Sequence, residues 1–282
     1  MPKTTIFLIA EYTPEEGIPY TVEERNDQEQ VTAFTQYTPQ GELDQRIENE
    51  YNEQGSLVEQ RQYFQGELTQ RIQYEYNESG KLSRETIIFM DGSKSFRIYE
   101  RDEANNSLQT RLIDEDGEEE ENLFRRMDSE GRVLEEKLLS EGALEYHTHN
   151  SFDNNGRLLS RKTTDNEGLE SAMVIHYDLD EQGRVTSAKI ADEEGGLLRI
   201  ETLSFDERGN RTELIFKDFQ QGYAGSEKWE YDLNNRITGH SRLSASGEPT
   251  SVSHFEYDET GRMIEEEQRS QQGVRILKYK YE

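Results

Sequence analysis

Histidines are the first side chains in this 282-residue chain whose spacing could support chemistry. His147 and His149 lie two residues apart, so on an extended strand both imidazoles point to one face, and Glu145 precedes them at the same spacing. Two imidazoles and a carboxylate are ligands that Zn²⁺ accepts. The chain contains no cysteine, and its other three histidines stand apart in the sequence. The pattern therefore favours exposed strand histidines, and we assign no metal site.

Carboxylates are the most abundant charged groups, with 60 Asp and Glu against 32 Lys and Arg. Pairs at the separation that glycoside hydrolysis needs must occur by chance in such a chain, so they do not indicate hydrolysis. Residues 114–118 and 178–181 lack the full alternating ligand order of a calcium loop. Phosphate-binding Gly-rich loops and Gly-x-Ser-x-Gly nucleophile turns are absent as well. We expect no catalytic residue and no cofactor, and predict that the protein is not an enzyme.

Charge and hydropathy limit the partners and the compartment. A net charge of -28 repels phosphate backbones, so we expect no nucleic-acid partner. Residues 4–10 form the only apolar run near the start, which is shorter than a signal-peptide core, and no run approaches bilayer length, so we expect no membrane insertion. A chain without cysteine fits a reducing compartment. The localisation stays open: the cytoplasm is favoured, and an exported protein whose leader was removed is the alternative.

A recurring sequence motif is expected to position the histidines, carboxylates and other polar side chains of this chain. It reads aromatic, Asp or Asn, two polar residues, Gly, and usually Arg or Lys before an aliphatic residue, as in residues 76–82, 152–158, 205–209 and 257–263, with looser copies at 51, 127, 177 and 231. Asp258 is expected to cap a turn in which Gly261 takes the left-handed conformation, a role that Asn235 also fits. A second family of glycines lies between the motifs, so that turns recur every 11 to 15 residues. This spacing predicts β-hairpins.

Between the turns, residues alternate with period two, which predicts strands, and no window sustains a helical period. We predict an all-β fold: an elongated repeat array of about 20 antiparallel strands in β-hairpins, forming a single-layer or curled, spiral meandering sheet. Residues 1–40 repeat least well because Pro14, Pro19 and Pro39 interrupt them. They are expected to form a less regular N-terminal cap continuous with the sheet, and residues 41–282 the repeat array.

One face of the sheet is expected to carry the motif aromatics and the apolar residues two positions before them. We call it the aromatic face, and it can make cross-strand contacts or bind a partner. The candidate binding residues on it are Tyr74, Tyr76, Tyr177, Phe205, Trp229, Tyr231, Phe255 and Tyr257. The basic residue after the turn glycine is expected to pair with an acidic residue of its own or an adjacent turn; it occupies positions 81, 132, 157, 184, 236 and 262.

The strings at residues 152–158 and 257–263 resemble the YD repeats of RHS-type bacterial proteins and teneurins. The resemblance covers residues 45–282 in nine or ten copies. It implies a long meandering antiparallel sheet that curls into a spiral or shell, which in large members encloses a C-terminal toxin. The motif spacing of mostly 23 to 28 residues is longer than is usual for that family, and no core-boundary motif or toxin domain is seen. About twenty-two strands are expected to be too few to close a shell, so encapsulation is not carried over.

These observations favour a non-enzymatic binding or scaffolding protein that presents a large β surface to a protein or glycan. The alternative is an acidic immunity or inhibitor protein that neutralises a basic toxin such as a nuclease, by charge complementarity. A carbohydrate-active enzyme is the third reading. Alternating lysines in the terminal strand around Lys278 and Lys280 suggest a protected sheet edge, so we predict a monomer.

Overall fold

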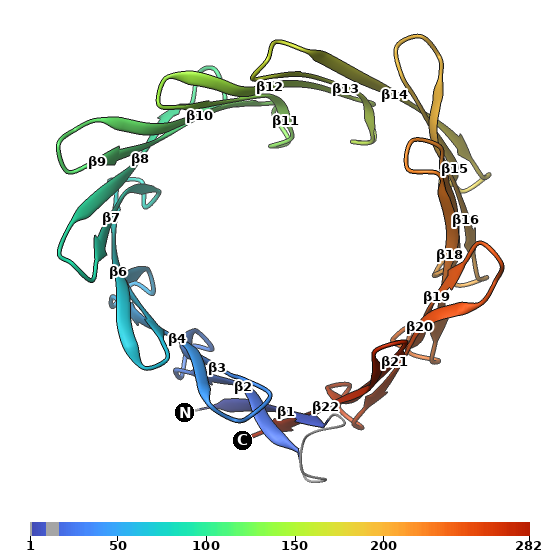
Figure 1. Ribbon diagram of the computed structural model, residues 1–282, viewed down its shortest axis with the longest axis horizontal. Helices are drawn as coiled ribbons and strands as arrows, with labels where there is room; N and C mark the ends of the chain where they lie inside the picture. Colours follow the sequence, from blue (N-terminus) through green and yellow to red (C-terminus); the bar gives the residue numbers. More distant parts are fainter. Residues whose placement is uncertain (1, 10–16) are drawn as a thin grey trace. The chain divides into compact units, whose positions relative to one another are not determined.

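The fold is all-β, as predicted. The computed structural model describes residues 2–9 and 17–282, and these residues form 22 strands and no helix (Figure 1). Every strand pairing recorded among them is antiparallel, as in the β20–β21 hairpin. Within these same residues, no helix is long and apolar enough to cross a membrane. Pro14, one of the prolines assigned to the N-terminal cap, lies outside the described residues.

The chain forms two compact units. The first consists of Met1–Asp44 and Ile175–Glu282, and the second of Gln45–Val174. Strands of the first unit are β1 Lys3–Ile9, β2 Ile18–Arg25, β3 Val31–Tyr37, β15 Val185–Ala191, β16 Leu197–Phe205, β17 Arg211–Asp218, β18 Tyr223–Tyr231, β19 Ile237–Ser244, β20 Pro249–Tyr257, β21 Met263–Ser270 and β22 Gly273–Tyr281. Strands of the second are β5 Leu57–Phe64, β6 Glu67–Tyr76, β7 Leu82–Phe89, β8 Lys94–Asp102, β9 Ser107–Asp114, β10 Glu119–Met127, β11 Val133–Ser140, β12 Ala143–Phe152 and β13 Leu158–Asp165. The boundaries between the units fall within β4 Leu43–Tyr51 and β14 Glu170–Leu179.

The first and last strands are neighbours in the first unit. β1 pairs with β22 from Thr4 opposite Tyr281 to Ile9 opposite Ile276, and with β2 on its other side. Figure 1 shows the two chain ends beside this pair. The prediction that the strand around Lys278 is a protected sheet edge is therefore wrong, because β22 has a hydrogen-bonded neighbour on each side, β21 and β1. Pairing β22 with β1 satisfies the backbone groups that an edge would leave open.

A one-residue irregularity recurs where a motif aromatic ends its strand. In the β20–β21 hairpin Glu256 lies opposite Glu265, but Tyr257 lies opposite Met263, so β21 has one extra residue there. The same shift occurs before Tyr76, Phe152, Phe205 and Tyr231. Such bulges change which residues face one another on either side of them.

The hydrophobic core is thin. Among the described residues only seven hydrophobic side chains are buried, for example Leu8, Ile72 and Ile175, and no large side chain is fully buried. The accessible surface is 17816 Å², whereas a compact monomer of this mass exposes about 12,500 Å². Cross-strand and turn contacts must therefore supply much of the stability that a thick core supplies elsewhere.

Candidate functional site

Turn chemistry sets the position of each motif aromatic, as the turn at Asp258 illustrates. The Asp258 Oδ1 accepts hydrogen bonds from the backbone N–H groups of Thr260 and Arg262, both at 2.9 Å. Gly261 has a φ of 91° and donates its N–H to the Asp258 carbonyl at 3.0 Å. Asn235 adopts a φ of 62° at the equivalent place in its own turn. The predicted capping and left-handed roles are confirmed.

The basic residue after the turn glycine has two contacts. First, it pairs with a carboxylate, as Arg262 Nε does with Asp258 Oδ2 at 2.9 Å. The prediction of pairing within the same or an adjacent turn is confirmed at all six positions, Lys81–Glu103, Arg132–Asp128, Arg157–Asp153, Arg184–Asp180, Arg236–Asp232 and Arg262–Asp258. Hydrogen bonds from the Thr260 hydroxyl and the Arg262 backbone hold the pKa of Asp258 below its usual range.

Second, in several of these turns the arginine guanidinium lies over the motif aromatic that ends a later strand. Arg236 Cζ is 4.7 Å from the centre of the Tyr257 ring. The same contact joins Arg132 to Phe152, Arg184 to Phe205 and Arg262 to Tyr281, at 5.3, 4.6 and 4.7 Å. Each such arginine therefore links its own motif turn to the aromatic residue that ends a later strand, by an ion pair and a cation–π contact.

Tyrosine hydroxyls make a third recurring contact. The Tyr257 hydroxyl donates to the carbonyl of Ile237, the first residue of the preceding strand, at 2.8 Å. Tyr76, Tyr231 and Tyr281 donate to Leu57, Arg211 and Met263 in the same way, each at 2.8 Å. Much of the polar and π surface of these tyrosines is thus used inside the array, which reduces what they can offer to a partner.

The eight predicted binding residues are not brought together in one site. Two of them, Tyr74 and Tyr76, lie in β6 of the second unit, and the other six lie in β14, β16, β18 and β20 of the first. Trp229 is stacked on His240 at 5.2 Å and lies 4.1 Å from Arg211 Cζ. Phe255 lies opposite Glu266. What these residues share is a position in the repeat, not a common pocket.

A buried carboxylate organises the aromatic face around Tyr74. Glu85 is 8% exposed, accepts the Tyr99 hydroxyl at 2.8 Å and pairs with Arg97 at 3.0 Å. Burial, with the Glu85 carboxylate nearby, raises the pKa of Tyr74 to about 12. Burial and the hydrogen bond to Glu85 raise the pKa of Tyr99 to about 12. This network stabilises neighbouring strands of the second unit.

A groove of about 590 Å³ opens in the first unit where β22, β1, β2 and β3 lie side by side. The groove residues Tyr279 and Tyr281 come from β22, Phe34 from β3, and the small Thr4 and Thr21 from the strands between. Register places them in two rows across the sheet. Tyr281, Thr4, Glu23 and Phe34 form one row, and Tyr279, Ile6 and Thr21 form the other. The sheet is hollowed here because small threonines stand between aromatic side chains.

Charged side chains surround this groove: Lys3, Glu23, Arg25, Glu29, Arg262 and Glu282. Arg25 pairs with Glu23, with Nη2 2.6 Å from the carboxylate. The sequence reasoning missed this site. Tyr279 and Tyr281 fit the aromatic pattern, but their assembly with Phe34 needs the pairing of β1 with β22, for which the sequence contains no local signal.

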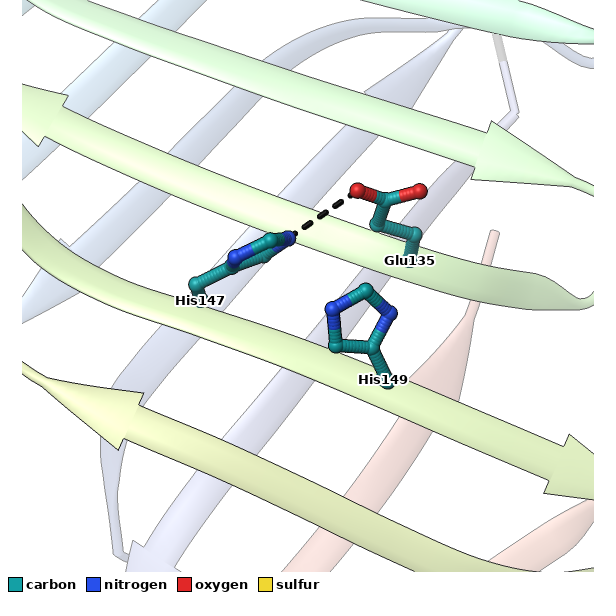
Figure 2. A group of neighbouring side chains, drawn as sticks. All are labelled: Glu135, His147 and His149. Atoms are coloured by element: carbon teal, nitrogen blue, oxygen red, sulfur yellow. Dashed lines mark hydrogen bonds and ion pairs between the residues drawn. The ribbon is translucent and has the colours of Figure 1, made fainter. Parts of the chain in front are cut away.

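The histidine pair lies on the face opposite the aromatic one, in the second unit. His147 Nε2 is 3.0 Å from Glu135 Oε1, and the two imidazole centres are 4.4 Å apart (Figure 2). Ligand atoms of Glu135, His147 and His149 lie within 4.8 Å of one another. Glu135 comes from β11, where it lies opposite His149. Glu145, the acidic neighbour considered from sequence, is the extra residue of a bulge in β12.

Comparisons with known proteins leave the family open. A family model described only as "Uncharacterised protein" matches residues 22–110, about a third of the chain. No curated protein matches.

Solved structures give weak similarities. A TcdB2–TccC3–Cdc42 structure is 15% identical with a TM-score of 0.32, covering 88% of this chain and 17% of that one. A porin-like protein from Bacteroides uniformis is 10% identical with a TM-score of 0.33, covering 99% and 97%. The Photorhabdus luminescens Tc holotoxin pore is 13% identical with a TM-score of 0.29, covering 89% and 19%. This chain thus spans about a sixth of the length of the first match, and scores this low support no argument about function.

Proposed function

We propose that this protein is a non-enzymatic binding protein, that its partner is another protein, and that the groove of the first unit is the centre of the contact. The observation that carries the proposal is the groove itself, about 590 Å³ in volume, with Tyr279, Tyr281 and Phe34 around the small side chains of Thr4 and Thr21. Concave sites of this size with a few convergent polar groups are typical binding sites.

The chemistry of the groove suits a protein partner. Tyrosine and arginine are, with tryptophan, the residue types that most often dominate binding energy at protein interfaces. Arg262 lies over the Tyr281 ring, and Arg25 also lines the groove, while Glu23 and Glu282 provide acceptors. An aromatic centre with a charged rim is the common arrangement of such an interface. The large accessible surface of 17816 Å² leaves room for an extended contact around this centre.

A groove-filling substitution tests the proposal. Thr21→Phe places a ring in the groove without removing an existing aromatic contact. Thr202→Phe is the matched control, because Thr202 is exposed and lies opposite Ser187 and Ile215, away from the groove residues. Each variant and the wild-type protein are immobilised and exposed to extract from the source cells, and captured proteins are identified by mass spectrometry. We expect a partner that binds the wild type and Thr202→Phe but not Thr21→Phe.

Two results would contradict the proposal. Partners captured equally well by Thr21→Phe would place the contact elsewhere. A glycan array that binds the wild-type protein and loses binding with Thr21→Phe, without any captured protein, would assign the groove to a glycan instead.

The charge excess favours a second candidate, an acidic inhibitor that captures a basic toxin. Its support is the excess of 60 carboxylates over 32 basic side chains, which raises association rates with cationic partners. Ionic strength separates the two candidates. A partner released by about 0.5 M salt, regardless of Thr21→Phe, points to the acidic inhibitor, because the screening length between exposed charges falls to about 4 Å at that salt concentration.

We further propose that the repeats are of the YD type. Support comes from the way each motif uses its residues: the Asp caps the turn, the Arg pairs with that Asp, and the guanidinium covers a later motif aromatic, as in Asp232, Arg236 and Tyr257. A profile search with the aligned motif copies of this chain tests this assignment. Recovery of unrelated sequences alone would contradict it.

A further inference from the structure

We propose that Glu135, His147 and His149 form a binding site for a divalent transition metal of the zinc class. All three offer ligand atoms within 4.8 Å of one another. Figure 2 shows the two imidazoles from β12 and the carboxylate from β11 gathered over one face of the sheet. Two histidines and one carboxylate are a common protein ligand set for Zn²⁺, with the fourth position left to water. This site is independent of the groove in the first unit.

Strand geometry holds the three ligands in place before any metal arrives. His147 and His149 are two residues apart on β12, so their side chains share a face. Glu135 lies directly opposite His149, where cross-strand side chains start about 5 Å apart. His147 is then the diagonal neighbour of Glu135 and already reaches its Oε1 at 3.0 Å. The ligands therefore come from two hydrogen-bonded strands, which limits the conformational entropy lost on binding.

The carboxylate is oriented to serve as a single-oxygen ligand. Glu135 Oε2 accepts a hydrogen bond from Arg126 Nε at 3.1 Å, which leaves Oε1 to the histidines. Ligands of a tetrahedral Zn²⁺ lie about 2.0 to 2.2 Å from the metal, so they sit roughly 3.3 to 3.6 Å from one another. His149 is exposed and His147 half-buried, so rotation of these side chains can bring the nitrogens to that separation. Arg126 would remain as the outer partner that holds the carboxylate.

Charged groups around the site are mixed in sign. Lys137 lies opposite His147, and Lys162 lies opposite His149 on the other neighbouring strand. The Lys162 ammonium pairs with Glu170 at 2.8 Å. These amines do not supply ligands, and they weaken the binding of hard cations such as Ca²⁺, which depends on several carboxylates. Imidazole nitrogens favour zinc, copper and nickel over calcium.

His240, a histidine outside the candidate site, makes a similar contact with a carboxylate and can be compared with it. His240 Nε2 is 3.1 Å from Glu227 Oε2, and Arg242 Nε lies 3.5 Å from the same carboxylate. This arrangement repeats the His–Glu–Arg part of the candidate site with one imidazole, and that imidazole is stacked on Trp229. The candidate site differs by the second histidine two residues away, which adds a second imidazole ligand to a hydrogen-bonded His–Glu pair.

Zinc titration of the full chain tests the proposal. Isothermal titration with ZnCl₂ should show one site per wild-type chain. His147→Gln, His149→Gln and Glu135→Gln should each lower the affinity by roughly tenfold or more, since even outer partners of metal ligands change affinity by about 10- to 100-fold. His254→Gln is the matched control, because His254 is an exposed strand histidine of the first unit, and it should bind like the wild type. Circular dichroism confirms that each variant is folded.

Two further measurements do not depend on the variants. Co²⁺ bound to the wild-type protein should give the intense visible absorption of a four- or five-coordinate site with nitrogen ligands. Hydrogen exchange should slow at the β11 and β12 amides when Zn²⁺ is added, because the metal would link these strands. The proposal is overturned if zinc binds His149→Gln and His147→Gln as tightly as the wild type. A Co²⁺ spectrum indistinguishable from that of the free ion would overturn it as well.

Discussion

Replacing Arg236 should reveal how the motif turns are linked to one another. Arg236 is 29% exposed and pairs with Asp232 at 2.7 Å, and its guanidinium lies 4.7 Å from the centre of the Tyr257 ring. Exposed cation–π contacts contribute about 0.5 to 1 kcal/mol, and desolvated ones about 2. Because Arg236 is partly shielded, we expect a coupling free energy between Arg236 and Tyr257 of about 1 kcal/mol.

A double-mutant cycle isolates this coupling. The variants are Arg236→Ala, Tyr257→Leu and the double variant, each unfolded by urea. Trp229 is the only tryptophan of the chain and lies in the first unit with both residues, so its fluorescence reports on the unit that is perturbed. Arg236→Ala should destabilise by more than the coupling, because it also removes the ion pair with Asp232. Arg236→Lys should lose most of the coupling, since the planar guanidinium provides the stacking.

Tyr257→Phe is the matched control for the ring. It keeps the aromatic face under Arg236 and removes only the hydroxyl that donates to Ile237 at 2.8 Å, for a loss of about 1 kcal/mol. The coupling to Arg236 should survive in this variant. A coupling indistinguishable from zero between Arg236 and Tyr257 would refute the argument, and would mean that each turn is stabilised only by its own contacts.

The remaining predictions concern pH and association. The pKa values of Asp258 and Asp232 are lower in the folded than in the unfolded state, so these groups contribute stability that is present at neutral pH and is lost as the pH falls below about 4. The Asp258→Asn variant should keep the turn cap but lose the ion pair with Arg262. Its free energy of unfolding should therefore depend less on pH in acid-unfolding curves than that of the wild type. Burial raises the pKa values of Tyr74 and Tyr99 to about 12, so they contribute stability that is present below about pH 10 and declines from there towards pH 12. The Tyr99→Phe variant should therefore lose less folded structure than the wild type at alkaline pH, as measured by circular dichroism. An unchanged alkaline unfolding curve would contradict this. Light scattering should give the monomer mass of 32.9 kDa, and a defined oligomer would show that association does not need a free strand edge.

Local interactions explain why so much of the fold was predictable from the sequence. A turn such as that at Asp258 forms through contacts within five residues, from the capping carboxylate to Arg262. Strand alternation is likewise a local pattern. The sequence alone therefore determined the strands, the turns, the Asp–Arg pairs and the absence of helix in the described residues.

Tertiary structure decided which of these strands and side chains meet. In the turn between β11 and β12, Ser140 lies opposite Ala143. If β12 had no bulge at Glu145, the same register would place Glu135 opposite Thr148. The Glu135 side chain would then lie on the face of the sheet away from His149. One extra residue thus brings Glu135 to the histidines. Pairing of β1 with β22 joins Thr4 to Tyr281, residues that lie near opposite ends of the sequence. Neither a single bulge nor a pairing at such sequence distance has a local energetic signature, so the metal-ligand set and the groove appear only in the folded molecule.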